Sequence, residues 1–221
     1  MTRYPSVPYV VPFAVFMGLL IVPFVVPMTE LADQCLRVAA LTGALLWVAR
    51  PAIDFQTRHA AASVLIGVMV FVTWVAPDIV APGYRHYWVF ENSLTGEARG
   101  TLSAGGRVDP VVLALRMLRA VALVPIVEEL FWRAWLMRWL ISPDFLKLPL
   151  GAYSAASFWA VAILFASEHG SYWDVGLAAG IVYNWWMVRA KSLGDLILAH
   201  AVTNACLSIY VIAAAKWEYW L

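Results

Sequence analysis

Long apolar runs, separated by short polar stretches, make up most of the chain. Seven runs reach the length of a membrane-spanning helix, and they cover residues 7–28, 31–49, 60–81, 111–141, 152–168, 173–189 and 193–215. A bilayer core is crossed by about 20 apolar residues in a helix. The pattern predicts an all-α polytopic membrane protein with seven transmembrane helices, or eight if the fourth run breaks at Pro125, where a kink is expected.

The polar stretches between the runs predict how the helices begin and which way they face. The longest covers residues 82–107, and Asp109 followed by Pro110 predicts a capped helix start directly after it. Short stretches carrying Lys and Arg lie at 50–58, 138–147 and 189–191. In a seven-span chain they share a side with the N-terminus, which the positive-inside rule makes cytoplasmic.

Composition narrows the class of protein further. Of 221 residues, 63% are hydrophobic and only 13% are charged, and the mean hydropathy is +0.77, which excludes a soluble domain. A net charge of +1 gives no reason to expect a nucleic-acid partner. The two cysteines, Cys35 and Cys206, lie in apolar runs without CxxC spacing, so neither a disulfide framework nor a cysteine zinc site is expected.

The fourth run contains ionisable side chains that a membrane helix rarely tolerates. Arg133 lies four residues after Glu129, so the two can pair on one helix face, whereas Glu128 points elsewhere. An ionisable group at membrane depth costs roughly 2.5–3.5 kcal/mol, so it requires a partner, a wet cavity or a functional role. A structural ion pair would explain Glu129 and Arg133 but leaves Glu128 over, and this surplus favours a function.

Other polar groups lie in the later runs. His169 follows the fifth run, while His200 and Asn204 are four residues apart on one face of the last. Together with Glu128 they suit hydrolysis in a polar cavity enclosed by the helices. The carboxylate can act as general base on water that an imidazole orients, and a second imidazole with an amide can donate to an oxyanion.

The residues alone leave other functions open. Glu128, His169 and His200 could form a His₂Glu metal site, although the HExxH spacing of zinc proteases is absent. A proton-coupled transporter would also use Glu168, and a non-catalytic scaffold or immunity-type protein would keep these groups for packing. In addition, a full span over 173–189 would place His169 and His200 near opposite faces unless that helix is tilted or re-entrant.

Three motifs, each on its own predicted helix, follow one another along the second half of the chain. They are Glu128-Glu129-x-x-x-Arg133, Phe165-x-x-x-His169 and His200-x-x-x-Asn204. Together they resemble the signature of the CAAX prenyl endopeptidase and bacteriocin-processing family of intramembrane proteases. The resemblance covers residues 109–221 of a single integral membrane domain, whereas residues 1–108 form N-terminal spans without a motif. The sequence around the motifs looks most like the bacterial branch associated with exosortase-type protein sorting.

The resemblance implies a glutamate-dependent endopeptidase that uses no cofactor and no metal. In that family pattern Glu128 activates water with the help of His169, while His200 and Asn204 stabilise the oxyanion. Glu129 assists catalysis. Two residues have orienting roles in the same pattern: Arg133, which pairs with Glu129, and Phe165, which packs beside His169.

The resemblance also predicts partners and location. The expected substrate is a membrane-associated or lipid-modified protein, cleaved near its C-terminus. The other expected partners are the lipid bilayer and an exosortase-type sorting system. The predicted location is the cytoplasmic (inner) membrane of a bacterium.

Overall fold

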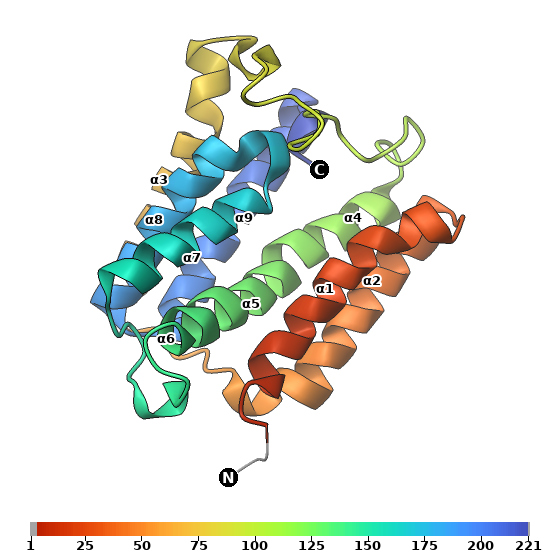
Figure 1. Cartoon of the computed structure of the whole chain (residues 1–221). Coiled ribbons are helices and arrows are strands. Elements are labelled where there is room, and N and C mark those ends of the chain that lie inside the picture. The colour runs from red at the N-terminus through yellow and green to blue at the C-terminus, as the bar shows by residue number, and fades with distance from the viewer. Residues whose placement is uncertain (1–3, 221) are drawn as a thin grey trace.

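The computed structural model describes residues 4–220, and this part of the chain is helical and contains no strand (Figure 1). Residues 1–3 and 221, the ends of the expected domain, lie outside the described residues. The α-helices are α1 (Val7–Val25), α2 (Glu30–Ala44), α3 (Ala60–Val80), α4 (Pro110–Leu118), α5 (Val124–Glu129), α6 (Met137–Trp139), α7 (Ala155–Ser167), α8 (Trp173–Ala190) and α9 (Leu193–Ala214). Shorter π- and 3-10-helical turns are η1 (Leu45–Ala49), η2 (Arg50–Ala52), η3 (Tyr84–His86), η4 (Arg119–Leu123), η5 (Leu130–Leu136), η6 (Phe145–Lys147), η7 (Gly170–Tyr172) and η8 (Trp217–Tyr219).

Adjoining helical segments join into continuous helices, which we call rods. Five rods are long and apolar enough to cross a membrane: Val7–Val25, Glu30–Ala52, Ala60–Val80, Pro110–Trp139 and Leu193–Ala214. The remaining two rods are α7, which is apolar but has 13 residues, and α8, which has 18 residues including several polar ones. Large apolar side chains such as Trp47 (87% exposed) and Leu65 (71%) lie on the outer surface, where lipid would cover them. The chain is therefore an all-α polytopic membrane protein, as the apolar runs predicted.

The fourth rod, Pro110–Trp139, begins at a side-chain cap and continues past a proline. Asp109 caps it, because its carboxylate accepts from the backbone N–H of Val111 at 2.8 Å and of Val112 at 3.2 Å. The rod continues past Pro125 to Trp139, so the eight-helix alternative does not occur. The π-helical turn η4 directly precedes α5. This wider turn accommodates Pro125, which has no backbone N–H to donate to the helix.

The rods form two groups, as Figure 1 shows. One contains α1, α2 and the α4–α6 rod, and the other contains α3, α7, α8 and α9. The closest packing within the second group is α3 against α9 and α7 against α8, while α9 also contacts η4 and α5 and so joins the groups. A cavity of about 710 Å³ lies between them, lined from α1, α2, α3, the α4–α6 rod, α7, α8 and α9.

The α3–α9 contact depends on a glycine. The carbonyl oxygen of Gly67 accepts from Thr203 Oγ1 at 2.8 Å. A Cβ atom at Gly67 would overlap the Ala199 carbonyl oxygen and lie 2.7 Å from Val202 Cβ. The two helices can therefore approach this closely only without a side chain at this position.

We expect Gly67→Ala to lower the free energy of unfolding by about 1–3 kcal/mol, because the added methyl group must push α3 away from α9. Gly18→Ala is the matched control, since a Cβ atom at Gly18 in α1 meets nothing within 4 Å. Thermal unfolding of both variants in the same detergent measures the difference. Equal melting temperatures would show that α3 and α9 do not pack as described.

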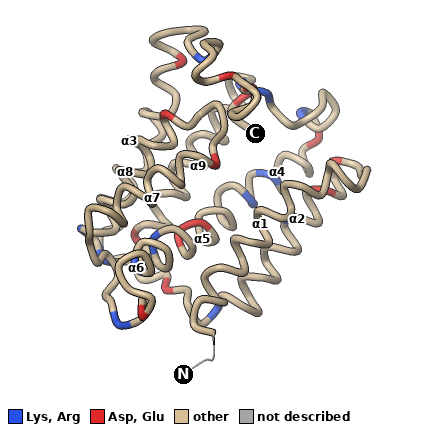
Figure 2. The backbone as a smooth tube through the Cα atoms, in the orientation of Figure 1, with Lys and Arg blue, Asp and Glu red and all other residues tan. Residues whose placement is uncertain are grey.

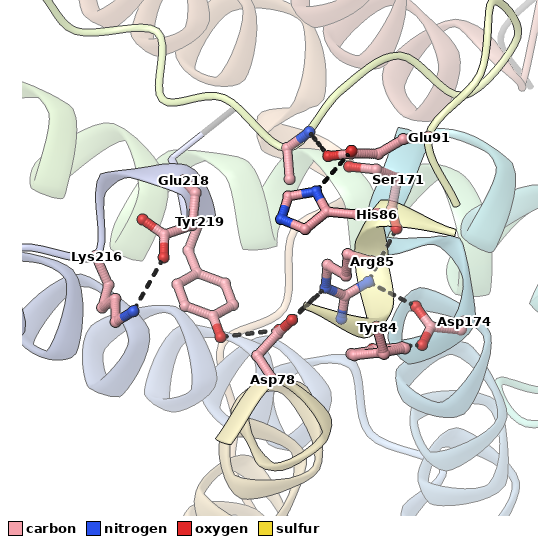
Figure 3. Close-up of polar contacts among 11 residues, drawn as sticks. Asp78, Tyr84, Arg85, His86, Glu91, Ser171, Asp174, Lys216, Glu218 and Tyr219 are labelled. Carbon is pink, nitrogen blue, oxygen red and sulfur yellow. Dashed lines mark hydrogen bonds and ion pairs between the residues drawn. The ribbon is translucent and has the colours of Figure 1, made fainter. Parts of the chain in front are cut away.

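The end of the bundle near the C-terminus is tied together by a cluster of polar side chains (Figure 3). The guanidinium of Arg85 donates to Asp78 at the end of α3 and to Asp174 at the start of α8, at 2.8 and 2.9 Å. Tyr219 of η8 also donates to Asp78, at 2.9 Å. Burial and a hydrogen bond to Asp174 raise the pKa of Tyr84, so its hydroxyl keeps its proton and donates. The cluster joins α3, η3, α8 and the C-terminal turn.

The long polar segment after α3 closes this end of the cavity. The backbone N–H of Thr101 donates to the Trp220 carbonyl oxygen at 3.0 Å, and Thr101, Leu102, Tyr219 and Trp220 all line the cavity. The segment between α3 and α4 is thus part of the cavity wall and not a free loop.

Candidate active site

Four of the expected catalytic side chains line one cavity: Glu128, His169, His200 and Asn204. Glu128 belongs to α5, His169 lies two residues after the end of α7, and His200 and Asn204 belong to α9. The 13 residues of α7 extend roughly 20 Å, less than a full bilayer core. Because α7 is short, His169 at its end lies inside the bundle, and the predicted conflict in depth between His169 and His200 does not arise.

Glu128 and His200 face each other across this cavity. His200 Nε2 lies 3.9 Å from Glu128 Oε2, and each residue is only 5% exposed. Within residues 4–220, Glu128 Oε2 has no hydrogen-bond partner. The carboxylate thus faces the imidazole across a gap longer than a direct hydrogen bond.

Glu129 lies behind His200, away from the cavity. Its Oε1 atom accepts from Arg133 Nη1 at 3.1 Å and from His200 Nδ1 at 2.7 Å. Glu129 and Arg133 are both fully buried, at 0% exposure. Arg133 Nε also donates to Asn184 Oδ1 at 2.9 Å, and its guanidinium lies 4.3 Å from the centre of the Phe165 ring. The predicted ion pair is present, and its carboxylate also fixes the imidazole of His200 through Nδ1.

His169 is fixed by its own helix and by its neighbours. Its Nδ1 atom donates to the Phe165 carbonyl oxygen at 2.7 Å, which leaves Nε2 as an acceptor. The ring packs against Phe165, with centroids 4.7 Å apart, and against Trp74 at 5.2 Å. A Cβ atom at Gly176 would lie 3.2 Å from the His169 ring, so this glycine lets α8 pack close to the imidazole.

Asn204 presents its amide to the same cavity from one turn beyond His200 on α9. Its Nδ2 atom donates to the Ala120 carbonyl oxygen at 2.8 Å. Ala120 belongs to the π-helical turn η4. The hydrogen bond uses one of the two amide hydrogens and leaves the other available to a ligand.

The structure adds residues that the motifs did not identify. Glu168, expected only in a proton relay, lines the cavity and accepts from Trp132 Nε1 at 3.0 Å. The Tyr183 ring stacks on His200 at 5.0 Å, and Asn184 anchors Arg133. The sequence carried a signal for Trp132, which lies four residues after Glu128, and for Asn184, which is a lone carboxamide in an apolar run. Their partners are distant in sequence and cannot be read from it.

The three residues proposed from sequence as metal ligands were Glu128, His169 and His200. Within the described part of the chain, no group of three or more His, Cys, Asp or Glu side chains is arranged to hold a metal ion. The geometry therefore does not form the His₂Glu site.

The comparisons with known proteins bear on the half of the chain that carries this site. No curated protein matches the chain, and no solved structure does. Residues 110–206 match the model of one protein family, described as Type II CAAX prenyl endopeptidase Rce1-like. All seven motif residues, from Glu128 to Asn204, lie within that match. The site-bearing segment is thus similar to the CAAX-type endopeptidases, which supports a membrane-embedded protease.

Proposed function

We propose that the protein is a glutamic-type intramembrane endopeptidase. The observation that carries the proposal is the pairing of Glu128 with His200 at 3.9 Å inside a buried cavity. The similarity of residues 110–206 to CAAX-type endopeptidases supports the same chemistry. The substrate would be a membrane-associated protein, cleaved near its C-terminus within the bilayer.

Glu128 is the proposed general base. Its carboxylate takes a proton from water while the water oxygen attacks the substrate carbonyl carbon, and His169 Nε2 accepts from the other water hydrogen. The attack forms a C–O bond and moves the carbonyl electron pair onto oxygen. When the C–N bond breaks, Glu128 returns its proton to the leaving nitrogen. Burial of the site strengthens each of these interactions by excluding bulk water.

His200 and Asn204 are the proposed oxyanion donors. His200 Nδ1 is bonded to Glu129, so donation to an oxyanion requires a second proton on Nε2. Arg133 donates to the same Glu129 oxygen. Glu129 and Arg133 act here as positioning residues, because they reach the substrate only through His200.

The setting of the site agrees with a membrane-bound substrate. One side of the cavity is lined by apolar side chains of α1, namely Phe16, Leu20 and Phe24. An apolar peptide segment could pack against them. We further propose that the protein resides in the cytoplasmic membrane of a bacterium and serves an exosortase-type sorting system, as its motif context indicates.

The test compares protein termini in membranes of cells carrying the wild type or Glu128→Ala. We expect a set of new termini that depends on Glu128, and their sequences identify the substrate. Glu97→Ala is the control, because this carboxylate is exposed and pairs with exposed Arg99. If a folded, inserted Glu128→Ala variant gives the wild-type profile in the native host, the protease proposal fails and a scaffold or a transporter becomes the better explanation.

A further inference from the structure

The aromatic ring of Tyr183 lies against the flat face of the His200 imidazole. The two ring centres are 5.0 Å apart, and the ring planes differ by 28°, an arrangement that aromatic rings favour. Tyr183 belongs to α8 and His200 to α9, so the stack joins two helices. Tyr183 borders the cavity but is only 1% exposed, so it acts on a ligand in the cavity through His200.

Hydrogen bonds fix the Tyr183 ring in this place. Its hydroxyl donates to Thr203 Oγ1 at 2.7 Å, and the Thr203 hydroxyl donates onward to the Gly67 carbonyl oxygen in α3 at 2.8 Å. Thr203 lies three residues after His200, which places both on one face of α9. The ring of Tyr183 is therefore held at its hydroxyl end while its face contacts the imidazole.

The proposed reaction requires His200 to keep one orientation. Its Nδ1 atom donates to Glu129 Oε1 at 2.7 Å, and its Nε2 atom lies 3.9 Å from Glu128 Oε2. One hydrogen bond fixes one atom of the imidazole but leaves the ring free to tilt about that atom. A contact across the face of the ring fixes its plane, and Tyr183 supplies that contact.

The next residue on α8 reaches the same histidine by a second route. Asn184 Oδ1 accepts from Arg133 Nε at 2.9 Å, and Arg133 Nη1 donates to Glu129 Oε1. Glu129 in turn accepts from His200 Nδ1. Figure 2 shows acidic positions on α5, the helix from which Glu129 enters this chain of contacts. The chain leaves α8 at Asn184 and returns to it at Tyr183, so α8 holds the imidazole at its edge and at its face.

We propose that Tyr183 is a positioning residue of the peptidase, whose ring fixes the plane of the His200 imidazole so that Nδ1 stays bonded to Glu129 while Nε2 stays directed at Glu128. A tyrosine that only filled the core would leave this orientation to Glu129 alone. The inference rests on the proposed function, because it assigns Tyr183 a role in the same reaction.

The first test follows the ring nitrogens of His200 by NMR, using the full chain with ¹⁵N-labelled histidine in detergent micelles. The chain has four histidines, and the His200→Gln variant identifies which signals belong to His200. In the wild type we expect one set of nitrogen signals, with a proton held on Nδ1. In Tyr183→Met and Tyr183→Leu the ring is absent, so we expect these signals to broaden or to show the proton exchanging between Nδ1 and Nε2.

Two further variants are the controls. Tyr183→Phe keeps the ring and should keep the wild-type nitrogen signals, and so should Trp185→Leu, because Trp185 lies on α8 with 48% of its surface exposed. Melting temperatures establish that each variant is folded, and two non-aromatic replacements are made so that the test does not depend on the folding of one. Unchanged His200 signals in the folded non-aromatic variants would overturn the proposal, as would an equal change in Tyr183→Phe.

The second test measures kcat and KM on a substrate identified from Glu128-dependent termini. We expect Tyr183→Met to lower kcat about 10- to 100-fold, the effect of misplacing an oxyanion donor, and to leave KM nearly unchanged. In a His200→Gln background the same substitution should lower kcat no further, because Tyr183 acts through His200. An equal loss in both backgrounds would assign Tyr183 to general packing and overturn the proposal.

The two measurements separate this inference from the proposed function. His200 signals that depend on the Tyr183 ring, in a protein without Glu128-dependent termini, would support the positioning of His200 and refute the peptidase. Glu128-dependent cleavage with the wild-type kcat in Tyr183→Met would support the peptidase and overturn the role of Tyr183.

Discussion

Glu128→Gln is expected to lower the rate of peptide-bond cleavage about 10²- to 10⁴-fold, the usual contribution of a general base. Glutamine has the shape of the glutamate it replaces but cannot take a proton from water. Within the described residues, Glu128 Oε2 is buried without a hydrogen-bond partner, so the fold does not depend on its charge. The cleavage rate is measured on a substrate identified from the comparison of termini.

The melting temperature distinguishes this loss from unfolding. We expect Glu128→Gln to unfold close to the wild-type temperature, because the amide keeps the shape of the carboxylate and Glu128 Oε2 accepts no hydrogen bond within the described residues. The control variant, Glu97→Gln, alters an exposed carboxylate and should keep the wild-type rate. A folded Glu128→Gln variant with full activity would rule out Glu128 as the base.

Glu129→Gln is expected to lower the free energy of unfolding by about 3–5 kcal/mol, the loss typical of breaking a buried ion pair from one side. Arg133 is 0% exposed, and Glu129 is its ion-pair partner within the described residues. The neutral amide would leave that guanidinium charged and buried. The same substitution removes the carboxylate that holds His200 Nδ1, so catalysis should fall as well.

A double variant tests this explanation. Glu129→Met with Arg133→Leu removes both charges, and it should be more stable than Glu129→Gln alone. Asp144→Asn is the surface control, because Asp144 and Lys147 form an ion pair with 71% and 77% exposed side chains, and it should leave the melting temperature unchanged. If the double variant is the less stable of the two, the charge of Arg133 is not the cause.

Helix positions along the chain were predictable because they depend on neighbouring residues. The third apolar run was expected at 60–81, and α3 spans Ala60–Val80. The cap at Asp109 follows from the backbone donors two and three residues away. The facing of Glu129 and Arg133 follows from helical periodicity alone. Each of these predictions concerns groups within about one turn of one another.

Only the tertiary structure decided how the polar groups of different helices meet. His200 and Glu129 are 71 residues apart in sequence, and periodicity assigns each a face on its own helix without saying which helix lies opposite. The depth of His169 depends on the shortness of α7 and on Gly176, which lets α8 approach its ring. The sequence by itself thus determined the rods and the residues suited to hydrolysis, whereas packing between rods determined their partners, because that packing joins residues far apart in the chain.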